Sequence, residues 1–502
     1  MTVAASAPRR SQETFLSLPL LLGVVSFLGT VSLSRIILSD PDTYLHVAVG
    51  RWMIAHGALP VHDPFSHSVP GAPWIPHEWL AELVLALTYD MLGWNGLVFL
   101  SVLCLAASAA LLARALLRDV DAFSVLIVVS VSIASILPHL LARPHIMALP
   151  LLVAWSAGLF HARGARRAPS LALLPLMLLW ANLHGSFMFG VCLAAYLGGE
   201  AVLDAAPPAR RATAFGWCGF LALTVVTALM TPHGVQGLLQ PIRFTGMTAL
   251  HSHIFEWMSP NFQGGHPLEA WLLGAMLLSL SLGLRLRITR LLLLLGLFHV
   301  ALAHNRHIDL VVFVAPLVVA ADFGPQLAAR LRRLHRSAAG EFLAEIAKPA
   351  KASACAAAAG LLLVTAALSL RDPVERPDHW SKLSGALGAA ETMGLSGPVF
   401  NTEAFGGYLI FSGVAPFIDG RIEMYGDAFL KCFADLTAGK EPALSRALDA
   451  YGITWTLLDP TEDAVNVLDH LPGWRRVYGD RYAVIHKREG APPPKSAEGR
   501  CA

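Results

Sequence analysis

The chain has 502 residues, of which 55% are hydrophobic and 14% are charged, and its formal net charge at pH 7 is +2. This composition excludes a soluble enzyme and indicates an integral membrane protein, while the small net charge by itself identifies no partner. The six cysteines show no paired spacing, so the sequence suggests neither a disulfide framework nor a thiolate metal site.

The first apolar run covers residues 15–38 and follows Arg9 and Arg10. It is longer than the apolar part of a secretory signal, and no small-residue cleavage site precedes Asp40. We therefore expect an uncleaved first helix, preceded by a cytoplasmic N-terminus at residues 1–14.

Further apolar runs follow, and about twenty apolar residues are needed to cross a bilayer. On this measure the sequence predicts about eleven spans, near residues 15–38, 94–117, 121–138, 145–161, 170–183, 186–204, 213–231, 268–284, 289–303, 307–324 and 354–370. The arginines and lysines between them fall in alternate loops, which places the N-terminus in the cytoplasm and the C-terminal part outside. The histidines gather on the outer side instead, so several outer loops are expected to converge on one cavity.

The first outer loop, residues 39–93, is too long for a simple connection. Asp42 can cap a helix, and His46, four residues later, would share a face with it. The apolar positions that recur there at helical spacing are Leu45, Val49, Trp52 and Met53. After a segment rich in proline and glycine, "HEWLAELVLAL" begins a second helix. We expect both helices to lie on the outer membrane surface.

These features resemble the GT-C superfamily of polyprenyl-phosphate-sugar-dependent membrane glycosyltransferases, which includes protein mannosyltransferases and lipid A aminoarabinose transferases. Asp40-Pro41-Asp42 stands where that superfamily keeps its acidic motif. The stretches "DPDTYLHVAVGRWMIAHG", "HDPFSH", "HEWLAE", "WANLHGSFMFG" and "FIDGRIEMYG" are also similar to a large group of bacterial multi-span membrane proteins. The resemblance implies a GT-C-like α-helical polytopic fold in a bacterial inner membrane. It also implies a polyprenyl-phosphate-linked sugar as donor, and no nucleic acid as partner.

Sugar transfer from a lipid phosphate needs a carboxylate base and donors for the phosphate leaving group. Asp42 is the candidate base, with Asp40 as a partner that tunes it or binds a cation; the alternative for Asp42 is a purely structural helix cap. Arg143 and Arg306 are the candidates for the donor phosphate, because a guanidinium matches its geometry. The histidines expected beside them are His145, His184, His304 and His307, with interfacial anchoring as the alternative.

Residues for substrate binding are expected nearby, including Trp257 for stacking on a sugar. The full set is His46, His77, Glu78, Glu256, Trp257, Asp419 and Arg421. Metal-ligand residue types occur at His251 and His253, at His304 and His307, and at the acidic pair, but none has a diagnostic spacing. No required metal is predicted, although the resemblance leaves a divalent cation possible at Asp40 and Asp42.

From Arg371 the composition becomes that of a soluble domain. After the transmembrane domain (15–370) we expect a small periplasmic α/β domain at 371–487 and a disordered tail at 488–502. Strands are predicted in "GPVFN", "APFIDGR" and "ITWTLLD", a hairpin in "WRRVYGDRYAVIHKR", and helices near 405–412, 425–438, 441–451 and 463–471. Asp419 and Arg421 either bridge within this domain or recognise the acceptor.

The leading hypothesis is an inverting glycosyltransferase that acts on a periplasmic lipid, glycan or protein. The alternatives are a lipid-linked sugar transporter or flippase, and a non-catalytic envelope assembly factor. A transporter predicts ionisable residues near span centres and repeated halves, and the sequence shows little of either.

Overall fold

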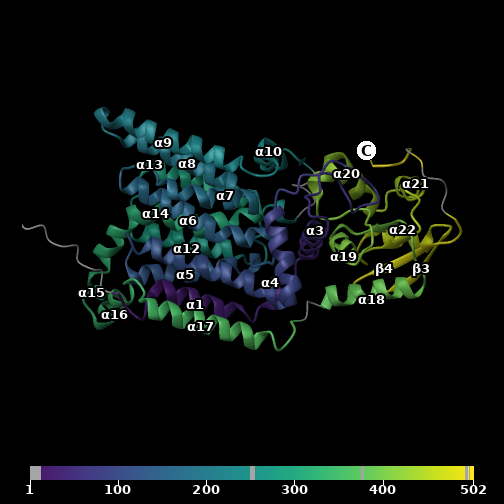
Figure 1. Ribbon diagram of the computed structural model, residues 1–502, viewed down its shortest axis with the longest axis horizontal. Helices are drawn as coiled ribbons and strands as arrows, with labels where there is room; N and C mark the ends of the chain where they lie inside the picture. The colour runs from purple at the N-terminus through teal and green to yellow at the C-terminus, as the bar shows by residue number, and fades with distance from the viewer. Residues whose placement is uncertain (1–12, 249–254, 375–377, 492–495, 497, 502) are drawn as a thin grey trace, which may run out of the picture.

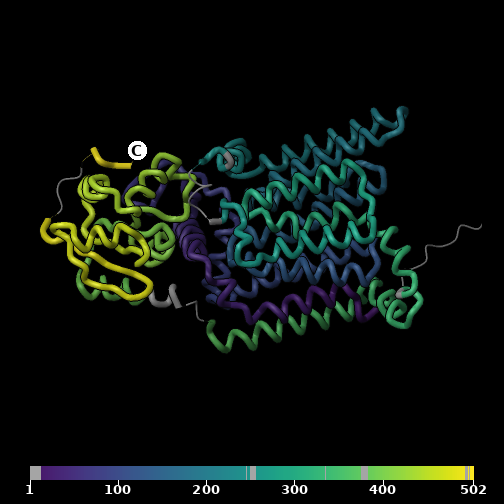
Figure 2. Tube along the Cα trace, turned by 180° about the vertical axis from the view of Figure 1, so that it is seen from behind, coloured from purple at the N-terminus to yellow at the C-terminus, as the bar shows by residue number. Residues whose placement is uncertain are grey.

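The computed structural model describes residues 13–248, 255–374, 378–491, 496 and 498–501 (Figure 1). The molecule is elongated, with a bundle of long helices at one end and a small α/β domain at the other (Figure 1). Helix α3 (Asp42–His56) lies at the junction between them. Seen from behind, the same two parts are separated along the long axis, and helices α1 and α17 run side by side along one edge of the bundle (Figure 2).

Seven helices in the described residues are long and apolar enough to cross a membrane. They are α4 (Trp79–Leu116), α5 (Ala122–Ile136) with η1 (Leu137–His139), α6 (Pro144–Gly164), α8 (Phe187–Asp204), α9 (Pro207–Ala228), η4 (Asn305–His307) with α14 (Ile308–Arg330), and α17 (Ala352–Ser369). Four shorter apolar helices complete the set, namely α1 (Leu18–Thr30), η2 (Leu171–Leu173) with α7 (Leu174–Leu183), α12 (Pro267–Ser281) and α13 (Ile288–Ala303). Each predicted span overlaps one of these helices, and the chain is a multi-pass membrane protein. The number of complete crossings stays a prediction.

Short helices connect the long ones. They are α2 (Ser34–Ile37), α10 (Gly234–Thr245), η3 (Phe255–Trp257), α15 (Arg332–His335) and α16 (Ala338–Ile346). The second predicted surface helix and the second predicted span are the two parts of α4, and they meet at a kink at Gly93, where the backbone is not helical and φ is 62°. Because only glycine adopts this conformation easily, Gly93 fixes the position of the bend.

Protein covers the apolar side of helix α3, the helix that was expected to lie on the membrane surface. Leu45, Val49 and Met53 on its apolar side are buried, and they pack with Trp74 and with Ile410 of α19 (Gly406–Phe411). The opposite side of α3 packs on α4. An amphipathic pattern requires only that its apolar side be covered, and here protein rather than lipid covers it.

The C-terminal domain contains a four-stranded sheet of order β1-β2-β4-β3. The strands are β1 (Val399–Asn401), β2 (Trp455–Leu457), β3 (Trp474–Gly479) and β4 (Val484–Arg488). Strands β1 and β2 are parallel, and the predicted hairpin forms the antiparallel pair β3 and β4. The helices around the sheet are α18 (Asp378–Thr392), η5 (Glu403–Phe405), α19, α20 (Ile422–Thr437), α21 (Ala443–Ala450) and α22 (Asp463–His470). All the predicted helices are present, and α18 was not predicted.

The strand predicted in "APFIDGR" is absent, since residues 415–421 form no regular structure. The Asn401 side chain takes the place of a neighbouring strand. Its Nδ2 donates to the Ile418 carbonyl at 2.9 Å, and its Oδ1 accepts the Phe417 N–H at 2.7 Å. Buried backbone groups need partners, and here a side chain satisfies them without a ladder.

The expectation of no disulfide is wrong, because Cys432 of α20 is bonded to Cys501. Cys501 is buried, and its N–H donates to the hydroxyl of Tyr451 at 3.1 Å. The last described residues of the chain are therefore fixed to the domain, in a tail that was predicted to be disordered. Two single cysteines 69 residues apart leave no spacing signal in the sequence.

Candidate active site

The acidic pair lies at the start of α3. Asp42 is the first residue of the helix, and its N–H donates to Asp40 Oδ1 at 2.8 Å. The side-chain contact at this helix end thus comes from Asp40, so the cap interpretation of Asp42 is wrong. The carboxylate of Asp42 is left for other contacts.

Arg143 joins three carboxylates that come from two different loops. It lies just before α6, and its Nη1 is 3.1 Å from Asp40 Oδ2 while its Nη2 is 2.9 Å from Asp42 Oδ2. Nη1 also contacts Glu256 of η3. Residues predicted from distant parts of the chain are therefore brought together. The guanidinium expected to bind phosphate already neutralises carboxylates.

Two of the three carboxyls on Arg143, those of Asp42 and Glu256, have opposite pKa shifts. Burial raises the pKa of Asp42 well above its ordinary value, and this outweighs the opposing effect of Arg143. Burial also acts to raise the pKa of Glu256, yet Arg143 and Arg306 together lower it below its ordinary value. Environments that separate two carboxyl groups in this way are typical of acid–base sites. Glu256 supplies the stable negative charge, and Asp42 is the stronger base.

Glu403, at the start of η5, belongs to the same electrostatic group. Burial and the neighbouring carboxylates of Asp419 and Asp40 raise its pKa to about 7. Its negative charge in turn contributes to the raised pKa of Asp42. Glu403 was not among the predicted site residues.

The C-terminal domain reaches the site through Gly420. A Cβ atom on this residue would lie 2.3 Å from Asp42 Oδ1, so the backbone of the domain touches the carboxylate. The flanking residues Asp419 and Arg421 are buried. Of the two alternatives given for them, the bridge within the domain is confirmed, because Arg421 bonds to Asp419.

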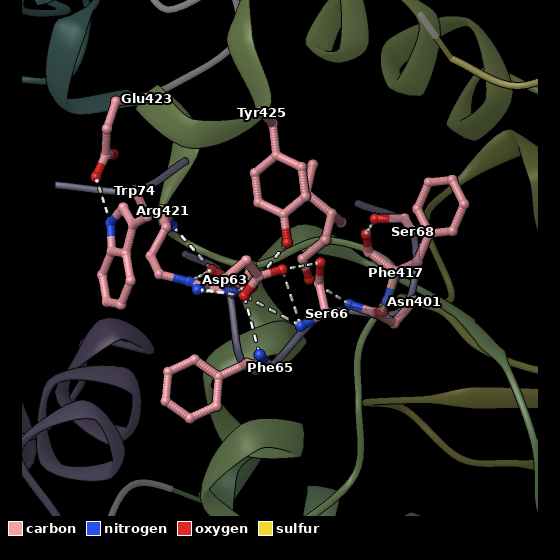
Figure 3. A network of polar contacts seen from close by, with 12 residues as sticks. Asp63, Phe65, Ser66, Ser68, Trp74, Asn401, Phe417, Arg421, Glu423 and Tyr425 are labelled. Atoms are coloured by element: carbon pink, nitrogen blue, oxygen red, sulfur yellow. Dashed lines mark hydrogen bonds and ion pairs between the residues drawn. The ribbon is translucent and has the colours of Figure 1, made fainter. Parts of the chain in front are cut away.

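A buried network holds this segment against loop 39–93 (Figure 3). Arg421 Nη1 is 2.6 Å from Asp63 Oδ1, and its Nε and Nη2 donate to Asp419 at 2.7 and 2.6 Å. Tyr425 donates its hydroxyl to Asp419 Oδ2 at 2.7 Å. Asp63 also accepts the N–H of Phe65 at 2.9 Å. Asp419 and Arg421 therefore position Gly420.

The predicted histidines on the bundle side surround Glu78. His184 Nε2 is 3.3 Å from Glu78 Oε1, and His77 Nε2 is 3.8 Å from the same atom. The His145 ring lies 6.4 Å from the His184 ring, and its Nε2 is 2.9 Å from the carbonyl of His139. Arg143 is close enough to act electrostatically on Glu78 and His184, but within the described residues it forms no hydrogen bond or salt bridge with them.

Burial lowers the pKa of the histidines around the site. The pKa of His46 falls to about 4, although its Nδ1 is 3.3 Å from Glu82 Oε1. Burial likewise lowers the pKa of His77, and that of His184 well below its ordinary value. At neutral pH these imidazoles are uncharged, so they offer single N–H donors and no positive charge.

A second group of predicted residues surrounds Trp257. The Arg306 guanidinium lies over the indole, 4.4 Å from its centroid, and within the described residues it forms no hydrogen bond or salt bridge. His304 Nδ1 is 2.6 Å from the Trp257 carbonyl, and the His307 ring lies 6.2 Å from the indole. Arg306 covers one face of the ring that was expected to stack on sugar. His251 and His253 lie outside the described residues.

The arrangement of charges does not fit a divalent cation at the acidic pair. Arg143 occupies the space between Asp40, Asp42 and Glu256, and its fixed positive charge supplies the neutralisation that a cation would give. Within residues 13–248 and 255–374 and the described C-terminal part, no three histidine, cysteine or acidic side chains are grouped to hold a metal.

The chain matches no protein-family model and no curated protein sequence. Among solved structures it is similar to the oligosaccharyltransferase AglB from Archaeoglobus fulgidus in complex with an inhibitory peptide and a dolichol-phosphate, with a TM-score of 0.52 and 12% identity over 88% of this chain and 69% of that one. The fold is that of a GT-C glycosyltransferase. The apo form gives the same values, and the form tethered to an acceptor peptide gives a TM-score of 0.51 and 13% identity over 88% and 68%. The predicted resemblance to the GT-C superfamily is thereby confirmed for the fold.

Proposed function

We propose that the chain is a glycosyltransferase that moves a sugar from a polyprenyl-phosphate carrier to an acceptor on the outer side of a bacterial inner membrane. The observation that carries the proposal is the contact of Asp42 with Arg143, in a GT-C fold. This contact joins the Asp42 carboxylate, from loop 39–93, to the Arg143 guanidinium, which lies just before α6. The acceptor is a lipid, a glycan or a protein.

In the proposed reaction, Asp42 accepts the proton of the acceptor hydroxyl as its oxygen bonds to the anomeric carbon. The bond from that carbon to the phosphate oxygen breaks on the opposite face, and the phosphate leaves with the electron pair. The configuration is therefore inverted. A phosphate leaving group needs charge stabilisation rather than a proton, so no second acid is required.

Arg306 is the better candidate for the donor phosphate. Arg143 is held by three carboxylates, whose combined charge repels another anion, whereas Arg306 contacts an aromatic face. We assign Arg143 to positioning Asp42. The neutral imidazoles of His145 and His184 use their single N–H groups on the His139 carbonyl and on Glu78, so we assign them to positioning.

The disulfide supports the proposed orientation. Bonds such as that between Cys432 and Cys501 persist in oxidising compartments, which in bacteria means the periplasm. The C-terminal domain that contributes Gly420 to the site would then lie in the periplasm, as the distribution of basic loops predicts.

The test replaces Asp42 by Asn in a strain that lacks the chromosomal copy. We expect this variant to reach normal protein levels without restoring the periplasmic glycan lost by deletion. The control is Asp90→Asn. Asp90 is an exposed residue of α4 whose carboxylate pairs with Arg51 of α3, and its replacement should restore the glycan fully. A non-catalytic assembly factor would tolerate Asp42→Asn, so restoration of the glycan by that variant refutes the enzymatic proposal.

A further inference from the structure

A cavity of about 360 Å³ lies at the junction of the bundle and the C-terminal domain, apart from the carboxylate group on Arg143. Its walls come from the end of the proline-rich segment of loop 39–93, from α10 and from the start of α20. Figure 1 shows α10 and α20 at this junction, outside the stack of long helices. The volume falls in the range of small-molecule sites.

The polar side chains from α10 have no protein partners. Gln240 is only 6% exposed, and across the described residues its amide forms no hydrogen bond. The same holds, among the residues described, for the side chains of Gln236 and Arg243, which also line the cavity. The amide atoms of Gln240 remain accessible, so a molecule in the cavity can reach them. A bound molecule with hydroxyl groups would form hydrogen bonds with both the N–H and the C=O of the Gln240 amide.

The opposite wall supplies an acceptor and an aromatic ring. Trp74 Nε1 donates to Glu423 Oε1 at 3.2 Å, and Figure 3 shows the two side chains beside Arg421. Burial raises the pKa of Glu423. Arg421 lies over the indole of Trp74, 4.7 Å from its centroid, and this contact fixes the wall.

We propose that this cavity binds a neutral, hydroxyl-rich sugar unit of the acceptor. Two amides, a carboxylate and an indole are donors and acceptors suited to hydroxyl groups. The charges of Glu423 and Arg243 are of opposite sign, so the cavity favours a neutral ligand. The inference rests on the proposed transferase function, because it names the class of molecule that would receive the sugar.

The cavity shares walls with the candidate active site. Phe244 lines the cavity, and its ring lies 5.6 Å from that of His77 and 6.0 Å from that of Trp257. Glu423 follows three positions after Gly420, which touches Asp42. The cavity therefore borders residues that contact the candidate site. Because the donor lipid stays among the spans, a cavity formed by α10 and α20 suits the acceptor.

The test measures sugar binding by the full chain in lipid nanodiscs. Saturation-transfer NMR is recorded with the methyl glycosides of glucose, galactose, mannose and N-acetylglucosamine as probes. We expect at least one probe to bind, and Gln240→Leu to weaken binding about tenfold, as loss of one buried hydrogen-bonding amide predicts. Gln236→Leu, at a more exposed position, should weaken it too. Gln263→Leu, outside the cavity, should leave binding unchanged.

Two further measurements distinguish failure of the cavity assignment from failure of the proposed function. Binding of the glycoside should persist in Asp42→Asn and should resist competition by a short-chain polyprenyl-phosphate sugar. If the probe binds and no transfer occurs in the unaltered chain, the cavity assignment stands and the catalytic proposal fails. The cavity assignment is overturned if no probe binds, if both glutamine variants bind as the unaltered chain does, or if the short-chain donor displaces the probe.

Discussion

Gly420 and Asp42 are in backbone-to-carboxylate contact, with room for a hydrogen atom and none for a methyl group: a Cβ on Gly420 would lie 2.3 Å from Asp42 Oδ1. The glycine comes from the C-terminal domain and the aspartate from the start of α3. The position of the candidate base therefore depends on a residue with no side chain.

Gly420→Ala should reduce the transfer rate about a hundredfold, because a displacement of about 1 Å in a reacting group can cost that much. The methyl group meets the end of a flexible side chain, so the melting temperature should change little. The matched control is Gly388→Ala in α18, where a Cβ meets nothing within 4 Å. Normal transfer by Gly420→Ala would show that Asp42 does not need this contact.

The pH dependence of transfer should report the raised pKa of Asp42. A base must be ionised, so activity falls as pH decreases through this pKa, and the acidic limb should lie above pH 4, the ordinary value for aspartate being about 3.9. Glu403→Gln removes a negative charge that raises the pKa of Asp42, so the limb should move to lower pH. Glu391→Gln, exposed on α18, is the control. An acidic limb that stays in place in Glu403→Gln contradicts the assignment of Asp42.

Replacing Arg143 should destabilise the chain as well as inactivate it. Arg143→Met leaves Asp40, Asp42 and Glu256 without their shared counter-charge, and breaking a buried pair in this way costs about 3–5 kcal/mol. Arg143→Lys should be intermediate, since one ammonium group cannot bond to three carboxylates with the geometry of a guanidinium. Thermal unfolding in nanodiscs compares the stability of both variants with that of the unaltered chain. Equal stability of all three chains would mean that the carboxylates do not depend on Arg143.

Chelation of metal ions should leave transfer unchanged. The guanidinium of Arg143 already lies between the acidic side chains, so a divalent cation at Asp40 and Asp42 would have to displace it. The rate is measured before and after treatment with EDTA, and again after addition of Mg²⁺ or Mn²⁺. A rate that falls with EDTA and recovers with either ion would place a cation in the reaction and refute the positioning role of Arg143.

The features predicted correctly from the sequence are those set by composition and period. Apolar length predicts the long helices, and the hairpin of β3 and β4 follows from two short runs separated by a turn. Arg143 was expected in the same site as Asp42, but as a ligand of the donor phosphate, and the structure pairs it with Asp42 instead.

Other features leave no signal in a single sequence. The role of Gly420 comes from the absence of a side chain, and that of Asp63 from a partner 358 positions away. The strand expected at 415–421 failed because Asn401 bonds to the backbone there. The protein cover on the apolar side of α3 was not predicted, because apolar periodicity does not distinguish a lipid face from a protein face.

The contact of Asp63 with Arg421 also bears on when the protein becomes competent during its synthesis. Its two partners are 358 positions apart, and the ribosome adds residues from the N-terminus onward. The first helices enter the membrane while Gly420 and Arg421 have not yet been made. The candidate site of the growing chain therefore stays incomplete until the C-terminal domain emerges and folds.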